Sequence, residues 1–290
     1  MNLHLLRIFF TVAEQGSFSR AADALHISQP AVSKAVRELE NQIDLALIER
    51  GGGRGFRLTE SGLALYEHAR GIFALERAAV EDIQARVGSQ KGKLVVGAST
   101  TIAGYRLPFY AARFLNNHPA ITLEIRVGNT QEISQALIEC AIDLALVEGI
   151  VEDPRIAVTH WRDDELHLFT FPGSGLEGKV DYEVLKEEIW LVREPGSGTR
   201  EVSERMLQTY GISPRRVMQI GSNEGIARTV AAGMGVAILP ELVARELVTL
   251  GKIRAVDFFP MNRPLFLLQL RERPPQPLVT KFSEILRTEA

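Results

Sequence analysis

The chain has 290 residues, of which 46% are hydrophobic, so it is long enough for two or three compact domains. Its formal net charge of −3 excludes a global electrostatic attraction to nucleic acid, so that any basic surface must be local. The single cysteine, Cys140, excludes a disulfide within the chain. The N-terminus does not resemble a leader peptide, and no apolar run reaches about 18 residues. These features predict a cytoplasmic protein without a membrane partner.

The first 45 residues predict three helices. Apolar residues from Leu5 to Ala13 recur at helical spacing, and Gly16 ends that helix. Ser17 or Ser19 then caps a second helix. After the break "HISQP", Pro30 fits the first turn of a third helix, where its missing N–H costs little. The stretch "FSRAADALHISQPAVSKAVRELENQI" therefore predicts two helices joined by a tight turn.

The third of these helices divides its side chains between two faces. Val32, Val36 and Leu39 share one face, which we expect to point inward. Small and polar residues at the other face suit insertion into a DNA major groove, where amides and hydroxyls read base edges and cations neutralise phosphates. An ordinary amphipathic hairpin with a solvated polar face is the alternative. The outward residues are Gln29, Ser33, Lys34 and Arg37.

The stretch "ALIERGGGRGFRLTESG" predicts a two-stranded wing. An apolar strand leads to a glycine-rich tip that carries Arg54, and a return strand ends at Thr59. A short basic tip of this kind can reach a neighbouring minor groove or the DNA backbone. The glycines do not match the G-x-x-x-x-G-K-[ST] pattern, which argues against a nucleotide-binding loop.

Residues Thr59 to Val87 contain no proline and predict one long helix, with a capped start at Thr59-Glu60-Ser61-Gly62. Apolar residues recur along it every seven positions, which favours pairing with the same helix of a second chain. Packing against the chain's own body is the alternative. The stripe consists of Tyr66, Phe73, Val80 and Val87, with Leu65, Ile72, Ala79 and Ile83 beside them.

The segment "FFTVAEQGSFSRAADALHISQPAVSKAVRELENQI…ERGGGRGFRLTESG" resembles the N-terminal domain of LysR-type transcriptional regulators. The resemblance implies a winged helix-turn-helix DNA-binding domain at 1–58 and a linker and dimerisation helix at 59–88. Asp44 replaces a usual helix-ending glycine and Ile48 a usual phenylalanine, but Asp tolerates a left-handed conformation and Ile keeps the apolar role. The positions that match the family's DNA contacts are Gln29, Pro30, Ser33, Lys34, Arg37 and Arg54.

After the polar hinge "GSQKGK", strands alternate with helices. The runs "KLVVGAS", "ITLEIRVG" and "DLALVEG" are apolar and β-branched, as is typical of parallel strands buried on both faces. Helices are expected near 104–116, 131–140, 201–210, 224–232 and 240–247. The pattern predicts an α/β fold with two lobes. A final strand "LFLLQL" and a helix at 277–287 return to the first lobe, so the chain crosses between lobes near Trp161-Arg162 and Pro264-Leu265.

Polar loops follow several of the predicted strands. "ASTTIAG", "REPGSGTRE" and "GSNEG" each place hydroxyl or amide side chains just before a helix. Such loops lie at the carboxyl ends of strands, where ligands bind, and free N–H groups there favour anions. Arg200 adds a cation. Simple helix capping by Ser, Thr and Asn is the alternative for each loop.

This half is similar to the regulatory domain of the same family, which resembles periplasmic solute-binding proteins. The resemblance implies an effector-binding domain at 89–290, with lobe I at about 92–162 and 266–290 and lobe II at about 163–265. "REPGSGTR" and "GASTTIAGYRLP" resemble a subgroup linked to sulfur or carboxylate metabolism. The expected effector contacts are Ser99, Thr100, Thr101, Gly149, Ser197, Thr199, Arg200 and Asn223.

Catalytic and metal sites find little support in the sequence. The stretch "HWRDDELH" matches no metal-ligand spacing, so its charges are expected to be solvated. Cys140 lies in "ALIECAIDLAL" and is expected to be a buried small residue of a helix without a partner base. "GSGTR" has neither a lysine nor a G-x-S-x-G elbow. No catalytic residue, metal or cofactor is therefore predicted.

Together these features predict a mixed fold: a winged helix-turn-helix, a long linker helix and a two-lobed α/β domain like the periplasmic binding proteins. The expected function is transcription regulation by a homodimer or homotetramer. Its expected partners are double-stranded DNA, a small effector (a carboxylate or a sulfur-containing anion) and RNA polymerase. A cytoplasmic solute-binding or small-molecule enzyme domain with an incidental helical arm is the alternative, but such a protein has no use for the wing.

Overall fold

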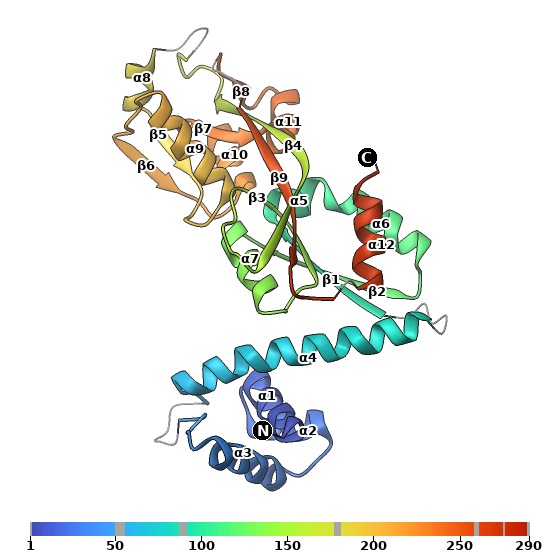
Figure 1. Ribbon diagram of the computed structural model, residues 1–290. Coiled ribbons are helices and arrows are strands. Elements are labelled where there is room, and N and C mark those ends of the chain that lie inside the picture. Colours follow the sequence, from blue (N-terminus) through green and yellow to red (C-terminus); the bar gives the residue numbers. More distant parts are fainter. Residues whose placement is uncertain are drawn as a thin grey trace. The chain divides into compact units, whose positions relative to one another are not determined.

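The computed structural model of the chain describes residues 2–49, 56–86, 92–176, 181–257, 261–274 and 276–288 (Figure 1). These residues form two compact units: the first contains the residues up to Ile83 and also Glu139–Ala141, and the second contains Gln84–Ile138 and the residues from Ile142 onward. The first unit is almost entirely helical, whereas the second alternates strands and helices.

Three short helices open the first unit, with the stops that the sequence predicts. Ser17 and Ser28 cap α2 and α3, since each side chain accepts a hydrogen bond from a backbone N–H of the first turn. Gly16 and Asp44 end α1 and α3 in the left-handed conformation, at φ 57° and 54°. Ser17 rather than Ser19 is thus the cap of the second helix. The helices are α1 (Leu3–Gln15), α2 (Phe18–Leu25) and α3 (Gln29–Ile43).

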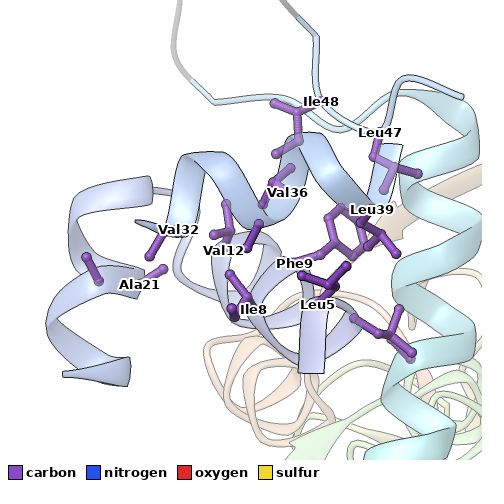
Figure 2. Close-up of a cluster of buried hydrophobic side chains, with 14 of the residues drawn as sticks. Leu5, Ile8, Phe9, Val12, Ala21, Val32, Val36, Leu39, Leu47 and Ile48 are labelled. Atoms are coloured by element: carbon purple, nitrogen blue, oxygen red, sulfur yellow. The ribbon is translucent and has the colours of Figure 1, made fainter. Parts of the chain in front are cut away.

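The core of the first unit lies where these three helices meet (Figure 2). Phe9 and Val12 of α1 pack with Val32, Val36 and Leu39 of α3, and all five side chains are buried. The inward face predicted for the third helix is therefore confirmed. Ala21 and Ala22 are buried on α2, and their small side chains let the helices cross closely.

The base of the wing is attached to α3 by a buried carboxylate. Glu40 accepts hydrogen bonds from the backbone N–H groups of Leu47 at 2.9 Å and Ile48 at 3.3 Å. Ile48 forms an antiparallel bridge with Leu58, which confirms that two extended segments pair here. The wing tip, with Arg54, lies outside the described residues.

The long helix is α4 (Glu60–Arg86), and Thr59 caps it by accepting a hydrogen bond from the N–H of Gly62. Part of its apolar stripe packs against the chain's own body. Tyr66 and Phe73 each lie with a ring centroid 5.3 Å from that of Phe10 on α1. Leu65 and Ile72 also contact this core. The interpretation of the whole stripe as a pairing seam is therefore wrong for this half of α4, where the alternative holds.

The far half of α4 is different. Val80 and Ile83 are 50% and 64% exposed, and Leu75 is 50% exposed on the same helix. Val87 lies outside the described residues. These exposed apolar side chains remain available to a partner helix.

The main sheet of the second unit has the strand order β2-β1-β3-β9-β4-β7, with β8 paired to β4. The first three strands of this order are parallel, and β9 and β7 join as antiparallel neighbours. A second sheet pairs β5 with β6. The strands are β1 (Gly92–Ser99), β2 (Ile121–Gly128), β3 (Leu144–Glu148), β4 (Ile156–Thr170), β5 (Ile189–Val192), β6 (Arg216–Gln219), β7 (Ala237–Pro240), β8 (Arg254–Ala255) and β9 (Met261–Leu270).

Helices cover both faces of the strands in each lobe, as the α/β pattern predicts. In lobe I, α6 and α12 pack on one face of the sheet through Phe114 and Phe282, and α7 covers the other through Leu137. In lobe II, α8 and α9 lie over one core and α10 and α11 over another. The helices are α5 (Thr100–Tyr105), α6 (Leu107–Asn117), α7 (Thr130–Ile138), α8 (Tyr182–Glu187), α9 (Gly198–Thr209), α10 (Asn223–Ala231), α11 (Glu241–Thr249) and α12 (Pro277–Leu286).

Two local expectations are wrong. The run "ITLEIRVG" forms β2, but β2 is an edge strand, so that Val127 is 57% exposed instead of buried on both faces. Cys140 lies in the turn after α7 and not within a helix, with a φ of 53° and a half-buried side chain. Among the described strands, β2 has a neighbour on one side only, and Cys140 lies beyond Ile138, the last residue of α7.

The two crossings between lobes occur where the sequence predicts them. They form one antiparallel pair, because β4 and β9 align along their length, with Arg162 opposite Leu265 and Asp163 opposite Pro264. The register shifts between His160 and Arg162. Both lobes are therefore attached to the same long ribbon, and α12 returns to lobe I through Phe282.

Candidate functional site

The outward face of α3 carries the residues predicted to contact DNA. Gln29, Pro30, Lys34 and Arg37 are exposed, and Ser33 is half-buried. Within the described part of the chain, neither Lys34 nor Arg37 takes part in an ion pair. A helix with free amide, hydroxyl and cationic groups on one side, and its other side anchored in a core, has the chemistry that base edges and phosphates require.

The wing supplies a second surface beside this helix. Arg57 is exposed, and its backbone carbonyl accepts a hydrogen bond from the N–H of Glu49 at 3.0 Å. The backbone N–H of Thr59 donates a hydrogen bond to the carbonyl of Leu47 on the first segment of the wing, also at 3.0 Å. The described residues thus fix the base of the predicted wing.

In the second unit, polar loops from both lobes meet. Asn223, at the start of α10, donates from its amide nitrogen to Thr101 Oγ1 at 2.9 Å and Thr199 Oγ1 at 3.1 Å. Thr101 belongs to lobe I, and Thr199 and Asn223 belong to lobe II. The structure therefore brings these three predicted residues together, and all three are buried.

Helix capping accounts for part of the remaining pattern. Ser99 caps α5, since its hydroxyl accepts a hydrogen bond from the N–H of Ile102 at 3.3 Å. Ser197 stands at the cap position of α9 without a capping bond from its side chain. Gly149 has a φ of 89° beside α9, and Gly198 lies so close to β3 that a Cβ atom there would be 2.4 Å from the carbonyl oxygen of Glu148. The backbone of the two lobes is in direct contact here.

A buried cluster of charges, which the sequence analysis missed, lies at the centre of this contact. Arg263 is 1% exposed and donates to Asp164 at 2.8 Å, Glu148 at 3.3 Å and Thr199 Oγ1 at 2.8 Å. Arg106 binds the other oxygen of Asp164 at 2.9 Å. Buried charges persist when each is paired, as here.

The expectation that "HWRDDELH" carries only solvated charges is wrong for Asp164, which is 4% exposed. It is right for Asp163, which lies on the surface with His160 at 3.0 Å. Arg263 could have been found as a lone cation in the apolar strand "NRPLFLLQL", and Asp164 as its partner on the other crossing strand. In the part of the chain that the structure describes, no group of His, Cys, Asp and Glu forms a metal site.

A second missed cation, Arg193, lies at the end of β5. It is 3% exposed, and its guanidinium binds both oxygens of Glu194 at 2.8 Å and donates to Thr100 Oγ1 at 3.2 Å. Burial raises the pKa of the Glu194 carboxyl, but the hydrogen bonds from Arg193, its own backbone N–H and Asn129, together with the charge of Arg193, lower that pKa overall. The Glu194 carboxyl therefore stays charged at neutral pH.

The predicted cation Arg200 has a different environment. Its guanidinium binds Glu204 at 2.7 Å, the carbonyl of Arg193 at 3.0 Å and Gln219 at 3.2 Å, all within lobe II. It lines a cavity of about 600 Å³ between α7 and α9, together with Ser197. The carboxylates of this cavity are Glu152, Asp153, Glu201 and Glu204.

Two family models match the chain. The bacterial regulatory helix-turn-helix protein of the lysR family matches residues 3–63, and the LysR substrate binding domain matches residues 88–290. The HTH-type transcriptional regulator CfxR of Cupriavidus necator is 38% identical over 269 residues, which are 89% of this chain and 81% of that protein. The HTH-type transcriptional regulator CysL of Bacillus subtilis is 33% identical over 248 residues, 85% of this chain and 83% of that protein.

Solved structures align along the same two regions. Full-length CbnR complexed with its target DNA is 25% identical and covers 99% of both chains, with a TM-score of 0.69. The regulatory domain of Synechocystis CcmR in complex with 2-PG is 25% identical and covers 68% of this chain and 96% of that one, with a TM-score of 0.61. None of the described helices combines the length and apolar composition that crossing a bilayer requires. The chain belongs to the LysR family: it is a DNA-binding transcriptional regulator with a two-lobed effector-binding domain.

Proposed function

We propose that the protein binds operator DNA through the outward face of α3 and the wing, and that a small anionic metabolite between the two lobes controls this binding. The exposed polar face of α3 carries the first half of the proposal. The similarity to CbnR, which was solved in complex with its target DNA, supports it. The DNA-contacting residues in this proposal are Gln29, Pro30, Ser33, Lys34, Arg37 and Arg54.

The effector half of the proposal rests on the convergence of Thr101, Thr199 and Asn223 from two lobes. A ligand that contacts both lobes can bind one arrangement of the lobes more tightly than another and so favour that arrangement. Control of a distant DNA-binding domain requires such a difference in affinity. The relative CcmR, whose regulatory domain was solved in complex with 2-PG, supports a small molecule here. The effector contacts in this proposal are Ser99, Thr100, Thr101, Gly149, Ser197, Thr199 and Asn223, with Arg200 as the cation that the sequence predicts.

The protein acts as a homodimer or tetramer in this proposal. Two recognition helices then lie in successive major grooves about one turn apart, which a single helix-turn-helix cannot achieve. The exposed side chains of Leu75, Val80 and Ile83 on α4 support pairing through the linker helix. An effector-dependent change in the spacing of the two heads alters the bend of the DNA and the access of RNA polymerase. This work takes place in the cytoplasm and includes no catalytic step.

A mobility-shift titration on the DNA upstream of the gene, at several salt concentrations, tests the DNA-binding half. Lys34→Ala and Arg37→Ala are expected to weaken binding to every sequence and to reduce the salt dependence, because each removes a phosphate contact. Gln29→Ala and Ser33→Ala are expected to relax base preference instead. Lys252→Ala, an exposed cation of lobe II, is the matched control. A protein that forms no sequence-specific complex, or four variants that behave like the control, would contradict the proposal.

A further inference from the structure

Arg193 and Arg200, two of the arginines near the lobe contact, differ in their suitability for an anion. Arg200 is bound to Glu204 and shares its cavity with three further carboxylates. The lining of this cavity carries four carboxylates against one cation, so its charge disfavours an incoming anion. The guanidinium of Arg200 makes its hydrogen bonds within lobe II, whereas that of Arg193 reaches Thr100 of lobe I.

Arg193 has the opposite properties. Its guanidinium is almost fully buried and reaches across the lobe contact to the hydroxyl of Thr100, at the start of α5. It also binds Glu194 through Nε and Nη2, the edge of the guanidinium that recognises a planar pair of oxygens. The acid group that now occupies this edge comes from the neighbouring residue of the same chain.

The carboxylate of Glu194 is placed so that it can move away from Arg193 into water. Its side chain is 23% exposed, and the amide of Asn129 donates to it over 3.4 Å, a long hydrogen bond. A carboxylate that moves from this position into water regains its hydration, which lowers the cost of the exchange. The Arg193 guanidinium cannot move out in the same way, because it is buried against both lobes.

We propose that Arg193 is the residue that recognises the effector's acid group, and that Glu194 is a resident competitor whose carboxylate the effector replaces. The inference rests on the proposed effector site and deepens it. The ligand class is a small oxyanion that offers two oxygens from one atom, such as a carboxylate, a sulfate or a phosphate group. The bound anion contacts Arg193 of lobe II beside Thr100 of lobe I, while Glu194 is released toward solvent.

Three variants of the full chain test this assignment: Glu194→Gln, Arg193→Gln and Arg200→Gln. The probes are sodium sulfate, sodium phosphate and sodium acetate, titrated against sodium chloride at equal ionic strength. Unfolding is followed by the fluorescence of Trp161 and Trp190, the two tryptophans of the chain, which both lie in the second unit. Arg205→Gln, an exposed arginine one helical turn further along α9, is the matched control.

Glu194→Gln is expected to bind the probe anions about tenfold more tightly than the wild type, because the competing charge is gone while a neutral side chain of the same size remains. Arg193→Gln is expected to lose anion-specific stabilisation, and Arg200→Gln to retain it. Unchanged or weaker anion binding by Glu194→Gln would contradict the proposal that Glu194 competes with the effector for Arg193. This variant gives an answer even if Arg193→Gln, which alters a buried residue, fails to fold.

The failure of this inference differs from the failure of the proposed function. If Arg200→Gln loses anion binding and Arg193→Gln keeps it, the assignment of the cation is wrong but the effector site between the lobes stands. If both variants bind like the wild type and Thr101→Val does so too, anions bind elsewhere and the proposed site is also wrong.

Discussion

A single guanidinium, that of Arg263, connects the parts that must move if the two lobes change their arrangement. It binds Glu148 at the end of β3 in lobe I, Thr199 in α9 of lobe II, and Asp164 on the neighbouring crossing strand. Asp164 and Arg263 are direct register partners in the β4–β9 pair. The ion pair between Asp164 and Arg263 therefore connects the two crossing strands at the place where they pass from one lobe to the other.

Replacing Arg263 by Met is expected to destabilise the second unit by about 3–5 kcal/mol, since Glu148 and Asp164 would then keep buried charges with fewer partners. Urea unfolding followed by Trp161 and Trp190 fluorescence measures this loss. Asp163→Asn, the exposed neighbour, is the control and is expected to change stability by less than about 0.5 kcal/mol. A loss for Arg263→Met as small as that of the control would show that the cluster adds little.

At the scale of single elements, the sequence was sufficient to predict where a helix begins when the contacts that cap the helix come from residues next to it in the chain. Ser17, Ser28 and Thr59 cap helices because their own side chains reach the first turn. The stripe on α4 was misread because spacing shows that one face is apolar but not which surface covers it. Phe10, whose ring stacks on Tyr66 and lies tilted against Phe73, is more than fifty residues away in the chain from either.

The link between α3 and the wing also depends on a contact that spacing cannot show. Glu40→Ala is expected to accelerate amide hydrogen exchange at Leu47 and Ile48 by about tenfold or more, because it removes the acceptor of two buried N–H groups. Glu40→Gln keeps an acceptor oxygen and is expected to have a smaller effect. The exposed Glu38→Ala is the control. Equal exchange rates in all three variants would show that the wing is held by other contacts.

The far half of α4 is the element on which assembly depends in the proposed function. Val80→Glu and Ile83→Glu each place a charge on an exposed apolar surface and are expected to weaken the dimer at least about tenfold. They are not expected to lower the stability of the first unit, whose core they do not enter. Sedimentation velocity over a concentration series measures the first effect, and thermal unfolding measures the second. A dimer as strong as that of the wild type would assign pairing to another surface.

For the whole molecule, the sequence predicted two lobes and both crossings, since each follows from the order of strands and helices. It did not predict how the lobes close. Thr101, Thr199 and Asn223 were correctly placed near the ends of strands, but the charges between them come from Glu148, Asp164 and Arg263, whose pairing depends on the folded ribbon. Conversely, Arg200 was chosen for its charge and for its match to a family effector position, and in the folded chain it binds Glu204 and lines a cavity with three further carboxylates.

The backbone of Gly198 in lobe II lies close to that of Glu148 in lobe I, and this contact offers a way to separate the lobes without altering a charge. In Gly198→Ala the new Cβ atom would lie 2.4 Å from the Glu148 carbonyl oxygen, so α9 must move away from β3. We expect a loss of about 1–3 kcal/mol in the stability of the second unit. The bond between Arg263 and Thr199, 2.8 Å long, should weaken with it. Gly221→Ala is the control, because its Cβ atom would meet nothing within 4 Å.

In a promoter-reporter assay, Gly198→Ala is expected to give a level of transcription that no longer depends on the effector, whereas Gly221→Ala is expected to respond to the effector normally. A normal response by Gly198→Ala would mean that the close contact of the two lobes is not part of the regulatory change.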